Sequence, residues 1–206
     1  MSACFWVQYF NSANAMVLSK DTDMLLLLGL VCPAASKRLT LRLDYGDKAD
    51  YIDMSRFRRW AADAFSSYND AFIYITLMGN DYLPKSLKGC GAPAALDALA
   101  GQGGARSAVD TANGLFALNE ELVLERLRGA CVRGACLPEA ARLVRNAWWY
   151  FIYSVCACNG SDAGSALCTA MVDDKTCFGW FVGAQGRVET SDELSPTPVF
   201  SISNYS

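Results

Sequence analysis

The amino-acid sequence predicts an α/β fold with a mainly helical C-terminal half, and three patterns carry this prediction. Met24 to Val31 is apolar on both faces, as a strand is when helices cover both sides of a parallel sheet. Leu39, Leu41 and Leu43 alternate with polar residues, which indicates a strand with one exposed face. Met54 to Phe65 has apolar residues at helical spacing, which predicts an amphipathic helix. Such alternation of strand and helix is typical of α/β domains.

Further strands are expected before and after the helical region. Tyr51 to Asp53 is a short strand candidate. Ala71 to Met78 is β-branched and aromatic and too short for a typical helix, so it predicts a second buried strand. Cys177 to Val182 and Arg187 to Glu189 have the pattern of a short strand pair.

The helices expected in the second half have recognisable ends. A short helix over Ala92 to Leu99 has a proline in its first turn, where proline is tolerated. Asn119 is a plausible N-cap for a helix over Glu120 to Arg128, which has acids in its first turn and arginines at its end. Pro138 opens a longer helix, which carries an aromatic stretch that we assign to the core.

The composition fits one domain, or one domain with an appendage. The chain has 206 residues, of which 52% are hydrophobic and 19% charged, enough apolar material for a core and too little charge for general disorder. A net charge of −3 gives no overall attraction to nucleic acid, although basic residues gather locally, as in Arg56, Arg58 and Arg59. The absence of histidine excludes Ser-His-Asp and Cys-His hydrolases. No glycine-rich loop of the P-loop or dinucleotide-binding type is present.

Cysteine usage and hydropathy set the expected compartment. Nine cysteines, an odd number in a long chain, do not form the pattern of a disulfide framework, so we expect free thiols and an intracellular protein, either nuclear or cytoplasmic. No signal peptide is recognisable. The longest apolar run, Met24 to Cys32, is far shorter than the roughly 20 residues of a membrane span, so no membrane association is expected.

Two aspartates follow the short apolar segment Ala15 to Leu18. If the stretch that contains Asp21 and Asp23 is extended, residues two apart project to the same side, so both carboxylates point to one place. Carboxylates forced together repel unless a cation lies between them, and Mg²⁺ accepts such oxygen ligands. The alternative is an ordinary polar turn whose aspartates cap the backbone.

A third carboxylate, Asp81, follows the expected strand Ala71 to Met78 in the motif Gly-Asn-Asp-Tyr. Ends of neighbouring parallel strands lie close together. Asp81 is therefore expected to share a pocket with Asp21 and Asp23, although about 60 residues separate them in the sequence. The alternative is an Asn-Asp turn without a ligand.

A glycine-rich turn, with Gly89 and Gly91, precedes the expected helix Ala92 to Leu99. Such a turn leaves backbone N–H groups open towards an anion, and the helix N-terminus adds positive potential. Lys85 and Lys88 flank it. The sequence therefore predicts a phosphate-binding hairpin, with a tight loop that uses glycine only for positive φ as the alternative.

Taken in order, these motifs resemble a superfamily of PIN-like nucleases that comprises flap endonucleases, excision-repair endonucleases and 5′→3′ exoribonucleases. The stretches that carry the resemblance are SKDTDMLLL, ITLMGNDYLP and SLKGCGAPAALDAL. The spelling GNDYLP is nearer to exoribonucleases and certain viral relatives, whereas SLKGCG before a small-residue helix is nearer to flap endonucleases. The resemblance covers residues 15–100, is thin afterwards, and corresponds to the C-terminal part of these enzymes.

The resemblance implies a divalent-metal-dependent, structure-selective 5′ nuclease that acts on DNA flaps or RNA. It makes Asp21, Asp23 and Asp81 ligands of Mg²⁺ or Mn²⁺, with two ions in the complete enzyme and no catalytic residue beyond the ligands. Two such ions, about 4 Å apart, activate a water and stabilise the leaving oxygen. The nucleic-acid contacts that it implies are Lys85, Lys88, Gly89 and Gly91.

The resemblance also implies a division of the chain. Residues 1–84 would form the C-terminal part of a PIN-like nuclease core with a partial parallel sheet flanked by helices. Residues 85–155 would hold a helix-hairpin-helix element and a helical region. Residues 156–206 would be a C-terminal extension that is partly irregular.

The sequence departs from the family pattern ahead of Asp21. Family members carry further aspartates and a Glu-x-Glu pair there, whereas the twenty residues before Asp21 contain no acid. Three carboxylates are too few for two divalent ions. Three accounts fit: a fragment of a longer enzyme, one half of a nuclease completed by an N-terminal segment on another chain, or a catalytically inactive module that binds nucleic acid or supports assembly. An unrelated α/β domain with aspartates in turns also stays open.

Overall fold

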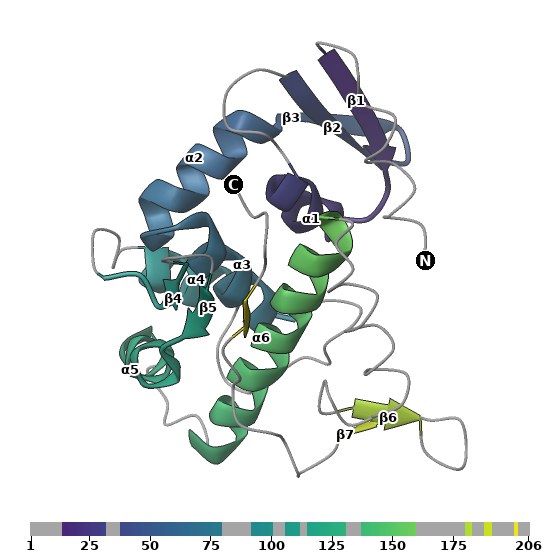
Figure 1. Cartoon of the computed structure of the whole chain (residues 1–206). Coiled ribbons are helices and arrows are strands. Elements are labelled where there is room, and N and C mark those ends of the chain that lie inside the picture. The colour runs from purple at the N-terminus through teal and green to yellow at the C-terminus, as the bar shows by residue number, and fades with distance from the viewer. Residues whose placement is uncertain are drawn as a thin grey trace.

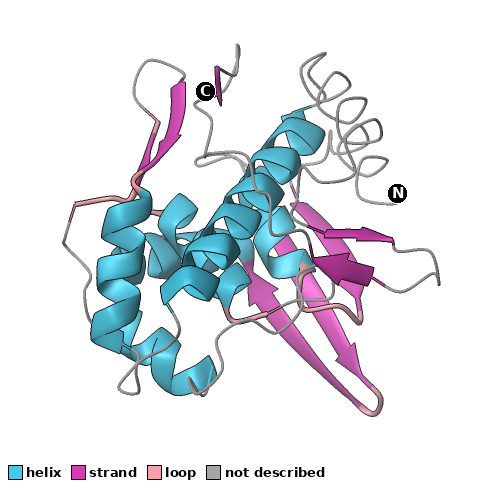
Figure 2. Cartoon of the chain, turned by 90° about the horizontal axis from the view of Figure 1, so that it is seen from below, coloured by secondary structure: helices cyan, strands magenta, loops and turns pink. Residues whose placement is uncertain are grey.

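The computed structural model describes residues 14–31, 38–79, 92–100, 106–111, 115–130, 137–159, 180–182, 188–190 and 200–201. The protein is a mixed α/β structure in which a three-stranded sheet lies at one end of a group of helices (Figure 1). Figure 2 shows the same division from below, with the helices packed together and the long strands of the sheet to one side. The predicted α/β class is confirmed at this level.

The sheet has the order β1-β2-β3, formed by β1 (Asn14–Ser19), β2 (Arg38–Tyr45) and β3 (Lys48–Asp53). Strands β1 and β2 are parallel, and β2 and β3 form an antiparallel hairpin. The hairpin turns at Gly46, whose positive φ of 67° is a conformation that favours glycine. The strands predicted around Leu39 and around Tyr51 are therefore confirmed.

One face of the sheet forms a small apolar core with the first two helices. Leu39, Leu41 and Leu43 alternate with less buried residues along β2, as the sequence pattern predicts. This sheet core consists of Val17, Leu28, Leu39, Leu41, Leu43 and Met54. The alternation gives β2 one apolar face because successive side chains of a strand point to opposite sides.

The apolar run predicted to be a buried strand is helix α1 (Met24–Val31), so that prediction was wrong. Helix α1 connects the parallel strands β1 and β2, which cannot be joined by a tight turn and need a crossover. Leu26 and Leu30 belong to the helical core, whereas Leu28 belongs to the sheet core. The helix is apolar on all sides because it lies between two cores. The sequence therefore shows no alternation of apolar and polar residues at helical spacing.

A close contact fixes α1 against α3 (Tyr68–Leu77). The Tyr68 hydroxyl donates a hydrogen bond to the backbone oxygen of Leu26 at 2.7 Å. Gly29 lies beside the same hydroxyl, and a Cβ atom at position 29 would lie 2.0 Å from the Tyr68 oxygen. Glycine is thus required here by space, since any side chain would meet the tyrosine.

Helix α2 (Met54–Phe65) has the bounds that the sequence predicts. Its N-cap is Asp53, whose Oδ1 accepts hydrogen bonds from the amides of Ser55 and Arg56 at 2.9 and 3.1 Å. A hydrogen bond from the Ser55 hydroxyl, followed by those from the backbone amides, lowers the pKa of the Asp53 carboxyl below its ordinary value. The helix ends where Ser66 adopts a left-handed φ of 74°.

The prediction of a second buried strand over Ala71 to Met78 was also wrong, because Tyr68–Leu77 is helix α3. Ser67 is its N-cap and accepts a hydrogen bond from the Asp70 amide at 2.9 Å. Eight of its ten residues are buried, so no polar face reveals the helical period. Without this strand, β1 and β2 are the one parallel pair among the described strands.

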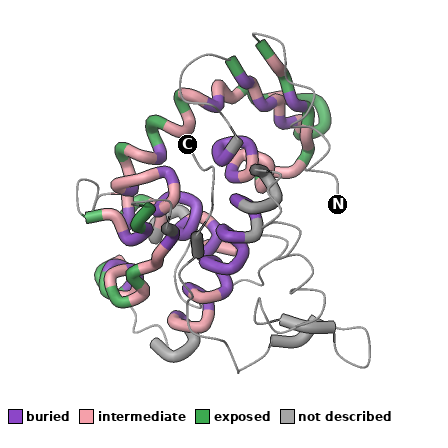
Figure 3. The backbone as a smooth tube through the Cα atoms, viewed as in Figure 1, coloured by how far each residue is buried: buried purple, intermediate pink, exposed green. Residues whose placement is uncertain are grey.

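The helices predicted in the second half are present as α4 (Ala92–Ala100), α5 (Glu120–Ala130) and α6 (Leu137–Asn159). The predicted N-cap of α5 is confirmed, because Asn119 Oδ1 accepts the Leu122 amide at 3.0 Å. Helix α6 is the longer helix that Pro138 predicts, and it packs against α1, α3 and α5. Figure 3 shows buried residues along α6 and α3, which form the centre of the helical core.

The aromatic stretch of α6 belongs to this core, as the sequence predicts. Trp148 and Phe151 are fully buried, and their rings stack at a centroid distance of 5.6 Å. Phe151 also meets Phe72 of α3 edge-on at 5.3 Å. None of the helices in the described part of the chain is both long and apolar enough to cross a bilayer.

Short strands complete the described structure. Strand β4 (Val109–Asp110) pairs with β5 (Leu115–Leu118), and β5 pairs with β8 (Phe200–Ser201). The strand pair predicted after residue 176 is confirmed as β6 (Trp180–Val182) and β7 (Val188–Thr190), which are antiparallel.

Candidate metal-binding turn

Asp21 and Asp23 lie in a tight turn between β1 and α1, at the carboxyl end of a parallel strand. The Asp21 amide donates to Ser19 Oγ at 2.9 Å, and Asp21 Oδ1 accepts the Asp23 amide at 2.9 Å. This second bond closes an Asx turn, in which an aspartate side chain takes the place of a backbone carbonyl. The stretch is therefore not extended but forms a polar turn, which is the alternative that the sequence left open.

The turn leads directly into the first residues of α1. The backbone oxygen of Asp23 accepts the amides of Leu26 and Leu27 at 3.1 and 3.3 Å. The two aspartates therefore precede the first helical turn, where amide groups and the helix dipole favour negative charge. Side-chain atom Oδ2 of Asp23 is itself buried. Both functions suggested for this pair, capping and cation binding, are compatible with this position.

The position of the pair matches a general rule for ligand sites. Open α/β sheets bind ligands outside the carboxyl ends of their parallel strands. Here β1 ends at Ser19, two residues before Asp21, and α1 then crosses over to the parallel strand β2. The strand that places the aspartates is thus β1, which precedes them, and not the apolar run that follows them.

Carboxylates are the oxygen donors that Mg²⁺ and Mn²⁺ prefer, so the donor type suits a divalent cation. Two carboxylates, however, are too few ligands to complete a metal site. Within the described ranges, no group of three or more Asp, Glu, Cys or His side chains could hold a metal ion. The third predicted ligand, Asp81, lies outside these ranges.

The predicted phosphate-binding residues also lie outside the described part of the chain. They are Lys85, Lys88, Gly89 and Gly91. Helix α4, which follows them, begins at Ala92 as expected.

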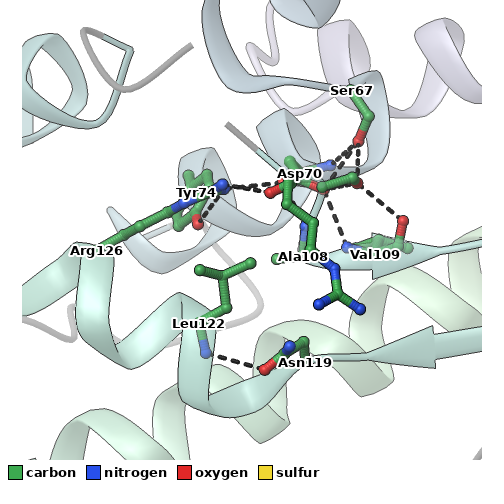
Figure 4. Close-up of polar contacts among 10 residues, drawn as sticks. Ser67, Asp70, Tyr74, Ala108, Val109, Asn119, Leu122 and Arg126 are labelled. Atoms are coloured by element: carbon green, nitrogen blue, oxygen red, sulfur yellow. Dashed lines mark hydrogen bonds and ion pairs between the residues drawn. The ribbon is translucent and has the colours of Figure 1, made fainter. Parts of the chain in front are cut away.

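A different aspartate, which the sequence did not single out, is the most deeply buried acid of the described structure. Asp70 of α3 is fully buried, and its Oδ2 lies 3.1 Å from Arg126 Nη1 of α5 (Figure 4). The amides of Ala108 and Val109 donate to the two oxygens of this carboxylate at 2.8 and 3.1 Å. The Ser107 hydroxyl donates to Oδ1 at 2.6 Å.

Arg126 completes this buried network. Its Nη1 donates to the Tyr74 hydroxyl at 3.2 Å, and its Nη2 donates to the backbone oxygen of Arg106. Burial raises the pKa of the Tyr74 hydroxyl, and the neighbouring Arg126 opposes this rise. The network joins α3, the segment before β4, and α5, and all its charges are compensated by protein groups. It therefore has the character of a structural connection.

The sequence contains a signal for this network that is visible in retrospect. Ser67 and Asp70 stand three residues apart ahead of an apolar run, which is the spacing of a capping box, here with Asp in place of Glu. The Ser67 hydroxyl also donates to Asp70 Oδ1 at 2.8 Å. The spacing predicts a helix start at Tyr68 and would have excluded the strand expected over the next residues.

A basic surface with an exposed tryptophan lies on α2. Arg56, Arg59, Trp60, Asp63 and Ala64 line an open hollow of about 600 Å³. Figure 3 shows exposed residues along this outer side of the helix.

No protein-family model, no curated protein and no solved structure matches this chain.

Proposed function

We propose that this chain is part of a divalent-metal-dependent nuclease that hydrolyses phosphodiester bonds in DNA flaps or RNA. The single observation that carries the proposal is the position of Asp21 and Asp23 on one turn, between the carboxyl end of a parallel strand and the N-terminus of a helix. The order of the motifs in the sequence supports the PIN-like fold and the helix-hairpin-helix element as part of the same proposal.

In this proposal the aspartates hold cations and take no other part in the reaction. Asp21 and Asp23 would hold Mg²⁺ or Mn²⁺ together with Asp81. A bound divalent cation supplies Lewis-acid stabilisation of a phosphoryl oxygen and an activated water. Further oxygen ligands, from residues outside the described ranges or from another chain, would be needed for two ions. Lys85, Lys88, Gly89 and Gly91 are proposed to contact the phosphate backbone.

A second function, a catalytically inactive module that binds nucleic acid, is favoured by one observation. Asp21 Oδ1 is occupied by the Asp23 amide at 2.9 Å, so one of the few candidate donor atoms already has a role in the turn. Such a module would bind duplex DNA in a salt-dependent manner that requires Lys88 and does not depend on Mg²⁺. The two functions differ in whether cations change the activity.

The test combines cation binding with cleavage. Mn²⁺ binding is measured by electron paramagnetic resonance, and cleavage is measured on 5′-flap DNA and on RNA with Mg²⁺ or Mn²⁺. Substitution Asp21→Asn keeps an oxygen that can close the turn but removes a charge, so we expect weaker Mn²⁺ binding without loss of fold. Asp81→Ala is expected to abolish cleavage, because removal of a charged ligand leaves the cation incompletely coordinated.

Glu121→Gln is the matched control, because Glu121 is an exposed acid on α5, whose main contacts are with α4 and α6 and not with the sheet. This variant should bind Mn²⁺ and cleave as the unaltered chain does. The proposal is wrong if the chain, alone or complemented by a candidate N-terminal nuclease segment, cleaves neither substrate, or if cleavage is the same in Asp81→Ala.

A further inference from the structure

Helix α2 has two faces of different character, and its exposed face takes no part in the site proposed above. The buried face carries Met54, Ala61 and Phe65. The exposed residues of the helix are Arg56, Arg59, Trp60 and Asp63. Positions 56, 59, 60 and 63 recur at intervals of three and four, so these side chains share one side of the helix.

Trp60 is an exposed aromatic ring held in place by two other rings. Its side chain is 53% exposed, although tryptophan is usually well buried. The Phe57 ring lies at a centroid distance of 5.8 Å, and the Phe65 ring meets Trp60 edge-on at 6.0 Å. These contacts restrict the orientation of the indole while half of its surface stays open to a ligand.

The two arginines beside Trp60 form no ion pair with a described residue, although Arg56 interacts electrostatically with Asp53. Ion pairs that link described residues include those of Arg42, Arg126 and Arg145, and neither Arg56 nor Arg59 takes part in one. Both line the same open hollow as Trp60. Arg56 precedes Trp60 by four residues, about one helical turn or ~5.4 Å of rise. A flat ring and two cations therefore face one space.

The charge of this surface selects the chemistry of its partner. Arg56 and Arg59 outweigh the single carboxylate of Asp63, so the surface is positive although the whole chain has a net charge of −3. A partner that fits must offer negative charge next to a flat, apolar surface. A nucleic-acid strand with unpaired bases offers both, since phosphates alternate with bases that stack on aromatic side chains. A duplex fits less well because its bases are already stacked on one another.

We infer that the exposed face of α2 binds single-stranded nucleic acid, with a base stacked on Trp60 and phosphates at Arg56 and Arg59. The inference names the form of the ligand and so rests on the proposed action on nucleic acid. It adds a binding surface separate from Lys85, Lys88, Gly89 and Gly91. Asp63 limits the positive surface on its C-terminal side.

The experiment measures binding of a fluorescein-labelled oligo(dT) and oligo(U) by fluorescence anisotropy in EDTA, where no cleavage can occur. Trp60→Leu retains apolar bulk but removes the aromatic ring, and we expect roughly tenfold weaker binding. Trp60→Phe retains a ring and should keep most of the affinity. Arg56→Gln and Arg59→Gln should each reduce the slope of log affinity against log salt by about 0.7. Lys48→Gln, an exposed cation on the hairpin, is the matched control.

Circular dichroism and thermal unfolding of each variant separate lost binding from lost folding. Equal affinity in Trp60→Leu and the unaltered chain, or no binding of either oligonucleotide, would overturn the inference. Displacement by polyglutamate as effective as displacement by unlabelled oligonucleotide, at equal charge, would also overturn it and favour an acidic peptide. A chain that binds through Trp60 but never cleaves with Mg²⁺ keeps this inference and removes the nuclease proposal. If the chain cleaves with Mg²⁺ but Trp60→Leu binds the oligonucleotides as tightly as the unaltered chain, the nuclease proposal is kept and this inference is removed.

Discussion

Two aspartate-containing regions of the molecule differ in how their carboxylates are used. Asp70 is fully buried and surrounded by protein donors, which include the Arg126 guanidinium and two backbone amides. Asp21 is only partly buried, and its Oδ1 accepts the one amide that closes its own turn. Asp70 thus links elements of the protein interior through hydrogen bonds, whereas Asp21 belongs to a partly exposed turn.

The difference shows that burial and partner number distinguish structural aspartates from candidate ligands. A buried carboxylate needs compensation, because desolvation penalises its charge. Asp70 receives this compensation within the protein and has no need of a cation. The turn of Asp21 and Asp23 receives part of its compensation from the N-terminus of α1, so a cation there would add to an arrangement that is already stable.

The largest expected effect is on Asp70. Substitution Asp70→Asn leaves the Arg126 guanidinium buried without its counter-charge, and we expect the free energy of unfolding to fall by about 3–5 kcal/mol. Urea denaturation of this variant measures the change. In the double variant Asp70→Asn/Arg126→Met, part of the loss should return because no unpaired charge remains. An Asp70→Asn variant as stable as the unaltered chain would contradict a structural role for the pair.

A smaller effect is expected at Asp53, an aspartate that caps a helix without a buried partner. Asp53→Ala removes the bonds to the Ser55 and Arg56 amides, and we expect a loss of about 1 kcal/mol, typical of an N-cap. The pKa of Asp53 is lowered in the folded protein, chiefly by the Ser55 hydroxyl and then by the Arg56 amide. Its contribution is therefore present above the unfolded value near 3.8 and is lost as the pH falls through the lower folded value.

The pH dependence gives this prediction a second measurement. Unfolding free energies measured from pH 6 down to pH 2 should converge for the unaltered chain and Asp53→Ala, because protonation removes the same interaction that the substitution removes. Asp47→Asn should follow the unaltered chain throughout. A constant difference at all pH values would mean that the cap does not depend on the charge of Asp53.

The smallest expected effect on stability is that of Asp21→Asn at the turn, where comparison with Asp21→Ala separates capping from charge. Asp21→Ala removes the acceptor for the Asp23 amide and should cost about 1 kcal/mol. Asp21→Asn retains an acceptor oxygen, so its stability should stay within about 0.5 kcal/mol of the unaltered chain. Thermal and urea unfolding of both variants measure this. If Asp21→Asn were as unstable as Asp21→Ala, the charge of Asp21 would itself stabilise the turn. Asp21 and Asp70 would then not differ in whether their charge is needed for stability.

Elements with one polar face could be predicted from the sequence, and elements without one could not. Helix α2 and strand β2 show clear periods of helix and strand, and the bounds of α2 agree at both ends. Helix α1 lies between two cores and α3 is buried on most sides, so neither has an exposed face that would reveal its period. The spacing of Ser67 and Asp70 was the better guide to α3, because capping depends on local hydrogen bonds and not on which face is solvated.

The candidate site could be predicted in its location more than in its conformation. Residue type and the neighbouring apolar segment directed attention to Asp21 and Asp23, and the structure places them at the end of β1. Their turn conformation depends on the hydrogen bonds that Ser19 Oγ and Asp21 Oδ1 accept from the Asp21 and Asp23 amides, and the pattern of apolar residues does not encode these bonds. Asp81 and the phosphate-binding residues lie outside the described ranges and stay predictions. Of the surface around Trp60, the sequence indicated only a local cluster of arginines and not the exposed tryptophan beside them.

Gly29 links the packing of α1 to the geometry of the aspartate turn. A side chain at position 29 would displace the Tyr68 hydroxyl, which holds the backbone of α1 at Leu26. The turn of Asp21 and Asp23 is continuous with α1, so a change in how α1 packs on Tyr68 acts on the segment that carries both carboxylates. An interior position without a side chain thus takes part in holding the aspartate turn, whether the aspartates bind a cation or only cap the helix.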